Sequence, residues 1–286
     1  MLDALPAAPV VLLGLAAAVT WGAADFGGGL ASRRAPLLGV TFFVQILGIG
    51  AALVLSAIRG EPFPGPADLA WAVVAGLAGS AGIAGLYGAL AAGQMSVIAP
   101  FVAILGASVP VLVGVALQGA PPPIVTAGIG LAFAAVVLVS GAAPGAGAGT
   151  RGLRLAVLGG AGIGLFSVFV SRISRELVFG PLVIIRTVAT AVFVLLILLG
   201  RRSWRLPRPA WGLVALTAVV DLLGNAAFLV ATHVGELAVA TILSSLYPVA
   251  TVLLAAIVLR ERITARHALG IVMAGIAIAL IAGGSA

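Results

Sequence analysis

The 286-residue sequence contains no cysteine, no lysine and only two histidines. Without cysteine, the chain has no disulfide, no thiolate metal site and no cysteine nucleophile, and the redox compartment is left undetermined. His233 and His267 are too few for a histidine metal cluster and give little support for a Ser-His-Asp hydrolase. The glycine runs lack a P-loop lysine and a preceding strand, so no ATP motor is expected. The sequence therefore predicts no enzyme, no metal and no cofactor.

Charged residues are scarce as well. They make up 8% of the chain, against roughly 25% in a soluble domain, while 62% of the residues are hydrophobic. A membrane helix takes about 20 apolar residues, so ten helices use roughly 200 positions and leave no room for a soluble domain. The net charge of +7 comes from arginines near the ends of apolar segments, where they meet lipid headgroups. We therefore expect a lipid bilayer as the partner, and no nucleic acid.

Ten apolar segments are marked off by charges, prolines and glycines. Because a bilayer satisfies no backbone polar groups, we expect helices rather than strands. The sequence predicts an all-α integral membrane protein with ten transmembrane helices, the first of which is a helix and not a cleavable signal. The segments are residues 8–30, 37–58, 68–92, 97–117, 124–142, 152–174, 181–199, 210–232, 237–259 and 266–283.

The two halves of the sequence match each other at an offset of 142 residues. This register places Gly22 on Gly164 and Gly128 on Gly270. We predict a first five-helix repeat at residues 1–142, an Ala/Gly/Pro-rich linker at 143–151 and a second five-helix repeat at 152–286. Five is an odd number, so the second copy enters the membrane in the opposite sense. Inverted repeats usually enclose the central site of a secondary transporter; the alternative is a duplicated scaffold that moves nothing.

The end of the second half carries the most recognisable motifs. Residues 244–248 read Ser-Ser-Leu-Tyr-Pro, an acidic-basic pair follows at Glu261 and Arg262, and the last helix has a glycine at Gly270. The first helix contains Trp21-Gly22, and the seventh opens with Pro-Leu-Val-Ile-Ile-Arg at 181–186. In these features the chain resembles the drug/metabolite transporter superfamily, specifically its ten-helix EamA-type branch. The first half departs from the pattern, with Gly106 at the register position of the helix proline.

The resemblance implies a carrier for small polar metabolites such as amino acids, in the cytoplasmic membrane and frequently in the export direction. Transport by alternating access through a midplane cavity is the main hypothesis. An exporter of organic cations or drugs is the alternative within transport. A non-transporting scaffold and a membrane enzyme are alternatives from other classes.

Three ionisable residues lie inside predicted membrane helices, where a charge is costly and a functional role is the default expectation. Asp25 follows Trp21 by one helical turn, so a carboxylate and an indole can hold an amine together. Arg186 can clamp a carboxylate, or it can form a structural ion pair with Asp25 or Asp221. A carboxyl group at Asp25 or Asp221 can also carry a coupled proton.

Uncharged polar residues complete the candidate substrate-binding set. Asn225 lies one turn from Asp221 in the eighth predicted helix and shares its face. Gln45 and Tyr87 are weaker candidates, because a membrane glutamine often bonds across helices and a lone tyrosine often anchors at the interface. The candidate site is therefore Trp21, Asp25, Gln45, Tyr87, Arg186, Asp221 and Asn225.

The membrane orientation has two conflicting predictions. Eleven arginines lie in the odd-numbered connections and only three in the even-numbered ones. The positive-inside rule therefore places both termini outside the cell. The family resemblance implies that both termini lie inside.

Overall fold

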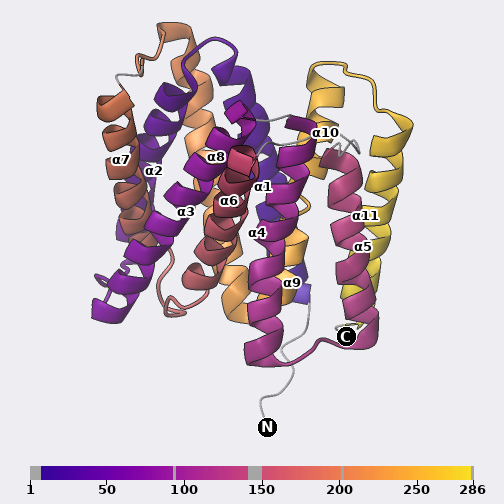
Figure 1. Ribbon diagram of the computed structural model, residues 1–286. Coiled ribbons are helices and arrows are strands. Elements are labelled where there is room, and N and C mark those ends of the chain that lie inside the picture. The colour runs from indigo at the N-terminus through magenta and orange to yellow at the C-terminus, as the bar shows by residue number, and fades with distance from the viewer. Residues whose placement is uncertain (1–7, 93–94, 141–149, 201–202, 285–286) are drawn as a thin grey trace.

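The computed structural model describes residues 8–92, 95–140, 150–200 and 203–284, without the side chains of 87, 90–92, 95–100, 140, 150 and 151. Within these ranges every regular element is helical (Figure 1). The helices are α1 (Ala8–Ser32), α2 (Leu37–Arg59), α3 (Pro66–Ala92), α4 (Met95–Gln118), α5 (Pro123–Ser140), α6 (Thr150–Val170), α7 (Phe179–Gly200), η1 (Arg208–Ala210), α8 (Trp211–Val234), α9 (Leu237–Ser244), α10 (Tyr247–Val258) and α11 (Ala265–Gly284).

Nine stretches of these described residues are helical, long and apolar enough to cross a membrane, and α9 and α10 together form one of them. The shorter apolar helix Pro123–Val139 within α5 supplies a tenth segment. Their exposed surface carries large apolar side chains such as Leu12, Leu112 and Leu198, as lipid contact requires. The predicted all-α, ten-helix membrane fold is thus confirmed.

One predicted helix is divided in two. The ninth apolar segment, expected to be continuous over 237–259, ends as α9 at Ser244 and restarts as α10 at Tyr247. The cause is Pro248, which has no N–H to donate to the carbonyl of Ser244 and whose ring crowds that carbonyl. A tighter turn forms at the break: the N–H of Leu246 donates to the carbonyl of Leu243 at 3.2 Å.

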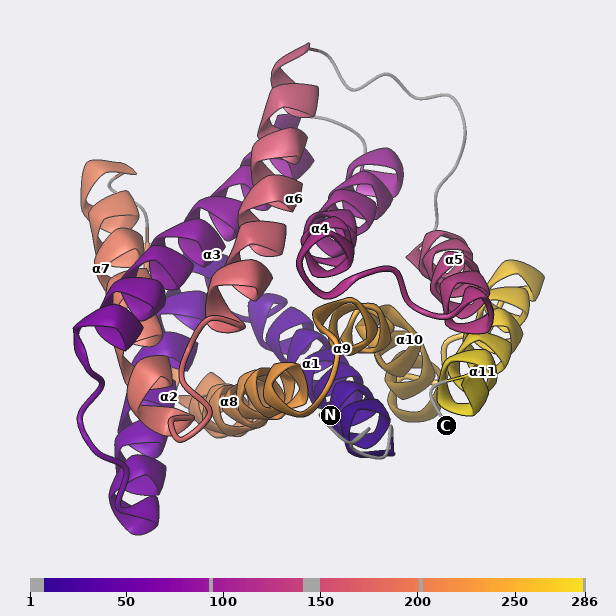
Figure 2. The same ribbon diagram turned by 90° about the horizontal axis from the view of Figure 1, so that it is seen from below.

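The helices of the two halves pack in a symmetric pattern. We count α9 and α10 together as the ninth membrane helix and α11 as the tenth. Each of the first five helices then has a counterpart five places later in the chain. The α1–α8 pair corresponds to α3–α6 under this exchange, and the α2–α7, α4–α9 and α5–α11 pairs each correspond to themselves. In Figure 2, α2 and α7 lie at one edge and α5 and α11 at the opposite edge. This is the arrangement of two inverted five-helix repeats.

The symmetry holds down to individual glycine contacts. A Cβ added at Gly128 of α5 would lie 2.7 Å from Cγ1 of Ile281, and one at Gly270 of α11 would lie 2.6 Å from Cγ2 of Val139. Both the glycines and their partners are 142 residues apart, which is the register predicted from the sequence. The predicted linker at 143–151 falls mostly outside the described residues, so the boundaries of the repeats stay a prediction.

Two further interfaces depend on glycine. Between α3 and α6, a Cβ at Gly85 would lie 2.6 Å from the backbone nitrogen of Gly159. At the symmetric interface between α1 and α8, a Cβ at Gly224 would lie 2.5 Å from Cδ1 of Trp21. Small residues allow this close approach of membrane helices. The α3–α6 contact is therefore backbone against backbone, whereas the α1–α8 contact receives an indole.

Carboxylates outside the membrane core hold the start of α7 in place. Glu61 accepts hydrogen bonds from the backbone N–H groups of Val178, Phe179 and Gly180, and these satisfy donors that a helix N-terminus leaves free. Asp68 accepts from the backbone and hydroxyl of Ser174 at 2.8 and 3.0 Å. These contacts fix how deep the residues of α7 lie in the bundle.

Candidate functional site

A cavity of about 270 Å³ lies between the two halves. Six of the seven predicted site residues line it; the side chain of the seventh, Tyr87, lies outside the described part of the chain. The six are contributed by α1, α2, α7 and α8, which are far apart in the sequence. They are Trp21, Asp25, Gln45, Arg186, Asp221 and Asn225.

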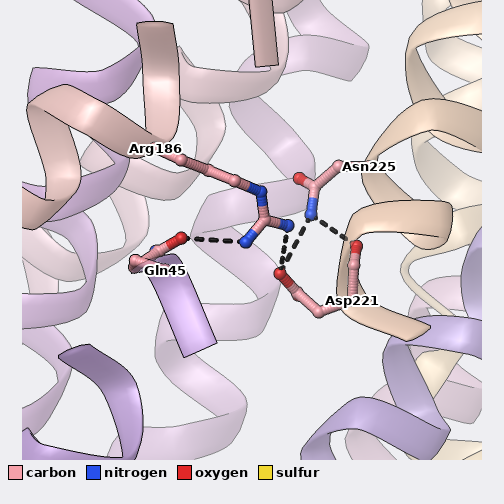
Figure 3. Close-up of polar contacts among 4 residues, drawn as sticks. All are labelled: Gln45, Arg186, Asp221 and Asn225. Carbon is pink, nitrogen blue, oxygen red and sulfur yellow. Dashed lines mark hydrogen bonds and ion pairs between the residues drawn. The ribbon is translucent and has the colours of Figure 1, made fainter. Parts of the chain in front are cut away.

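Arg186 is held by two partners at the cavity wall (Figure 3). Its Nη2 donates to Oδ2 of Asp221 at 2.6 Å, and its Nη1 donates to Oε1 of Gln45 at 3.0 Å. Asn225 supports the same carboxylate, because its Nδ2 donates to Oδ2 of Asp221 at 3.3 Å and to the backbone carbonyl of that residue at 2.7 Å. The structure therefore brings four predicted residues into one hydrogen-bonded cluster and selects Asp221, not Asp25, as the partner of Arg186.

The surroundings of the guanidinium leave it little freedom. Arg186 is only 3% exposed, and it lies seven residues into α7, about 10 Å from the start of that helix. The absence of a side chain at Gly48 of α2 makes room for the guanidinium, since a Cβ there would collide with Nη1. The buried Nε has no hydrogen-bond partner among the described residues. Each terminal nitrogen thus has one partner, and Nε is the guanidinium nitrogen that has none.

Trp21 and Asp25 form a second polar region on α1. The indole of Trp21 rests over Gly224 and packs against Phe228, with ring centroids 5.4 Å apart. Asp25 is exposed toward the cavity, and no ion pair or hydrogen bond joins its side chain to another described residue. The two carboxylates of the cavity therefore differ: Asp221 is neutralised by an arginine, whereas Asp25 is available to a ligand.

The cavity wall repeats the symmetry of the fold. Four pairs of lining residues are separated by 142 positions, so equivalent places in the two halves face the same space. Their side chains differ in polarity, and each half contributes different chemistry to the site. The pairs are Trp21 with Ile163, Asp25 with Ser167, Gly79 with Asp221, and Ile83 with Asn225.

Sequence reasoning missed Tyr247 as a lining residue. It is the first residue of α10 and lies in the membrane interior, because the preceding helix stops at Ser244. The available signal was its place between Leu246 and Pro248 in the Ser-Ser-Leu-Tyr-Pro motif. A polar ring at a broken membrane helix indicates a binding role rather than an interfacial anchor.

The electrostatics of the cavity favour a positive ligand. With both carboxylates ionised, Asp25 and Asp221 outnumber Arg186 by one negative charge. The remaining polar groups are uncharged hydroxyls and amides, and much of the wall is apolar, formed by residues such as Ile83, Leu182 and Phe166. Such a cavity can bind a small molecule that combines one cationic group with an apolar body. No group of three or more metal-ligating His, Cys, Asp or Glu residues occurs in the part that the structure describes.

Comparison with known proteins agrees with this architecture. Residues 150–283 match the model of the EamA-like transporter family. A crystal structure described only as "Crystal structure of protein" superposes with a TM-score of 0.78 at 20% identity, over 95% of this chain and 96% of that chain. At this identity the likeness shows the fold alone. A search of curated proteins found no match.

The family match has direct consequences for the class of protein. Members of this family are membrane transporters and not enzymes, and the cell membrane is their usual location. The membrane-length helices agree with a multi-pass protein in that membrane. The second half of this chain is thus similar to the EamA-like transporter family, and the whole chain shares its fold with the solved structure.

Proposed function

We propose that the protein is a secondary transporter that exports a small amine-bearing metabolite across the cytoplasmic membrane by alternating access. The observation that supports this substrate class is the unpartnered carboxylate of Asp25 on the wall of the midplane cavity. Export is the direction implied by the family resemblance. Asp25 binds the ammonium group of the substrate, and the indole of Trp21 adds a cation–π attraction to the same group.

In this proposal Arg186 mainly holds helices together and does not bind the substrate. Its pairing with Asp221 and Gln45 crosslinks α7, α8 and α2 across the two halves. Each terminal nitrogen keeps a second N–H, but Arg186 is only 3% exposed and already binds two partners, so little of the guanidinium is presented to a substrate carboxylate. The substrate is thus recognised chiefly by its positive group, which favours an amine or organic cation.

A zwitterionic amino acid is the second candidate substrate. The supporting observation is the buried Nε of Arg186, which has no partner among the described residues and can donate to a carboxylate. An amino acid would then span from Asp25 to Arg186. This candidate differs from the first in requiring both charged groups of the ligand.

Ligand-induced thermal stabilisation of the detergent-solubilised protein tests the proposal. The panel contains simple amines, zwitterionic amino acids, carboxylates and lipophilic cations. A ligand at 100 times its Kd adds about 2.7 kcal/mol to the free energy of unfolding. We expect amines to stabilise the protein, Asp25→Asn to abolish the effect, and Thr187→Val, which removes an exposed hydroxyl outside the cavity, to retain it.

Other outcomes identify the alternatives. Stabilisation by amino acids but not by amines, lost in Arg186→Lys, would support the zwitterionic substrate. Stabilisation by carboxylates alone would contradict the amine proposal. Flux of the stabilising ligand into proteoliposomes separates a carrier from a scaffold, because a scaffold shows binding at most and no flux.

A further inference from the structure

A second, smaller cavity of about 60 Å³ lies at the break between α9 and α10. It shares Trp21, Ser167 and Tyr247 with the main cavity, and its other wall includes Thr241 and Ser244. One water needs about 10 to 15 Å³ of such space, so the small cavity can hold a compact ligand with a water. No charged side chain lines it.

The hydroxyl groups around this cavity present oxygen lone pairs. Ser244 donates its hydroxyl hydrogen to the carbonyl of Thr241 at 2.9 Å, and Ser245 donates to the carbonyl of Ile242 at 2.7 Å. Ser167, from α6, donates to the carbonyl of Ile163 at 3.3 Å. Because each hydrogen is used within its own helix, the hydroxyl oxygens remain as acceptors.

Thr241 is the independent indication of a ligand. Its side chain is 4% exposed, it lines the small cavity, and its hydroxyl has no hydrogen-bond partner among the described residues. A buried hydroxyl in a membrane protein is costly when it is unpaired, and here the cavity is the space from which a partner can come.

The backbone adds further acceptors at the same place. Pro248 has no N–H, so the carbonyl of Ser244 loses its helical donor. The α9 helix also ends here, and the C-terminal end of a helix carries partial negative charge. The break is therefore rich in neutral oxygen acceptors. This combination suits a hard, singly charged cation, whereas divalent ions usually take carboxylate ligands.

We propose that the small cavity binds a monovalent alkali cation of the Na⁺ class, held by the oxygens of Thr241, Ser244, Ser245 and Ser167. Broken membrane helices whose C-terminal ends lie at the midplane coordinate Na⁺ in other carriers. The inference rests on the proposed transport function, because it supplies that function with a coupling ion. Shared walls and like charge make the ion and the amine compete, so the expected coupling is exchange.

The test compares Na⁺ with Cs⁺, at constant ionic strength, in thermal unfolding of the full-length protein without amine. Cs⁺ has the same charge and a much larger radius, so it fits oxygen ligands spaced for Na⁺ poorly. We expect Na⁺ to raise the unfolding midpoint saturably and Cs⁺ to leave it unchanged. Thr241→Val, which removes the hydroxyl and keeps the shape, raises the Kd for Na⁺ by about tenfold or more, since a lost ligand of about 1.4 kcal/mol corresponds to tenfold.

Control variants keep the outcome interpretable. Thr187→Val removes an exposed hydroxyl of α7 outside both cavities and retains the Na⁺ response. If Thr241→Val fails to fold, Ser244→Ala reports on the same cavity. An equal midpoint in Na⁺ and Cs⁺, or an unchanged Na⁺ response in Thr241→Val, overturns the proposal.

The two proposals fail separately. Amine binding measured in Cs⁺ depends on Asp25 and not on Thr241, so it tests the proposed function alone. In Na⁺ we expect the Kd for the amine to rise in the wild type and to rise less in Thr241→Val. Amine binding that ignores Na⁺ removes the coupling ion and leaves the amine carrier in place.

Discussion

The two halves of the molecule share one scaffold and differ in the chemistry that they bring to the cavity. The first half contributes Asp25, which has no partner among the described residues, and Gly79 of α3, which brings no side chain to the cavity wall. The second half has Asp221 at the position that matches Gly79, and it pairs this carboxylate with Arg186. It also has a broken helix where the first half has the continuous α4. Duplication thus preserves the packing, while substitution at matched positions leaves Asp25 of the first half without a partner and pairs Asp221 of the second half with Arg186.

The largest effect is expected from breaking the ion pair that distinguishes the second half. Removing one partner of a fully buried pair costs about 3 to 5 kcal/mol, and this is the upper limit here because the Asp221 side chain is 30% exposed. We therefore expect Arg186→Met to lower the unfolding midpoint strongly, and the double variant Arg186→Met/Asp221→Leu to recover much of the loss. Asp25→Asn, which removes a carboxylate without a partner, is the control and leaves the midpoint close to wild type. Equal destabilisation by Arg186→Met and Asp25→Asn would contradict the assigned roles.

The next effect tests the symmetry itself. Gly128→Ala and Gly270→Ala each place a Cβ within 2.7 Å of a side-chain carbon on the opposite helix. Overpacking of this kind costs about 1 to 3 kcal/mol. Because the contacts are equivalent, the two variants should lower the free energy of unfolding by similar amounts in thermal or denaturant unfolding. Gly275→Ala, whose added Cβ meets open space, is the control. A large cost at one glycine and none at the other would show that the halves pack differently.

A smaller effect on amine affinity is expected when Trp21 is compared with Ile163, the matched residue of the second half. A cation–π contact contributes about 0.5 to 2 kcal/mol and is strongest for tryptophan. Trp21→Phe should therefore weaken amine binding by about 3-fold to 10-fold, measured by ligand titration. Ile163→Leu, at the matched position of the second half, should leave the affinity unchanged. Equal weakening by both variants would indicate that only cavity shape matters.

The smallest expected effect concerns Tyr247. A neutral hydrogen bond contributes about 0.5 to 1.5 kcal/mol, so loss of the phenol hydroxyl in Tyr247→Phe should reduce amine affinity by about 2-fold to 10-fold. Leu105 occupies the matched position in the first half, and Leu105→Met serves as the control for altered packing. An unchanged Kd in Tyr247→Phe would limit the role of this ring to shaping the wall.

Much of this architecture could be predicted from the sequence. The lengths of the apolar segments predicted the ten membrane helices. The 142-residue offset between the two halves predicted the register that the contacts of Gly128 and Gly270 follow. The break at residues 245–246 was not predicted, although Pro248 was visible, because a proline in a membrane helix produces either a kink or a break according to its neighbours. Residue type alone does not decide between these outcomes.

The candidate site divides in the same way. The rarity of charge inside membrane segments singled out Asp25, Arg186 and Asp221, and all three line the cavity. The choice of Asp221 as the partner of Arg186 could not be predicted, because it depends on how α7 and α8 are rotated toward each other. Tyr247 was missed for a similar reason: its position in the membrane interior follows from the helix break, and not from its residue type.

The glycine interfaces have a mechanical consequence for the proposed alternating access, in which the two halves move against each other. Between α3 and α6, backbone touches backbone at Gly85 and Gly159, so the surfaces can glide with little side-chain rearrangement. At the matching α1–α8 interface, the indole of Trp21 fills the space left by the missing side chain of Gly224. The α3–α6 interface therefore favours sliding of the helices, whereas the α1–α8 interface resists it. Because Trp21 also lines the cavity, a bound ligand would contact its indole and alter how easily α1 moves against α8.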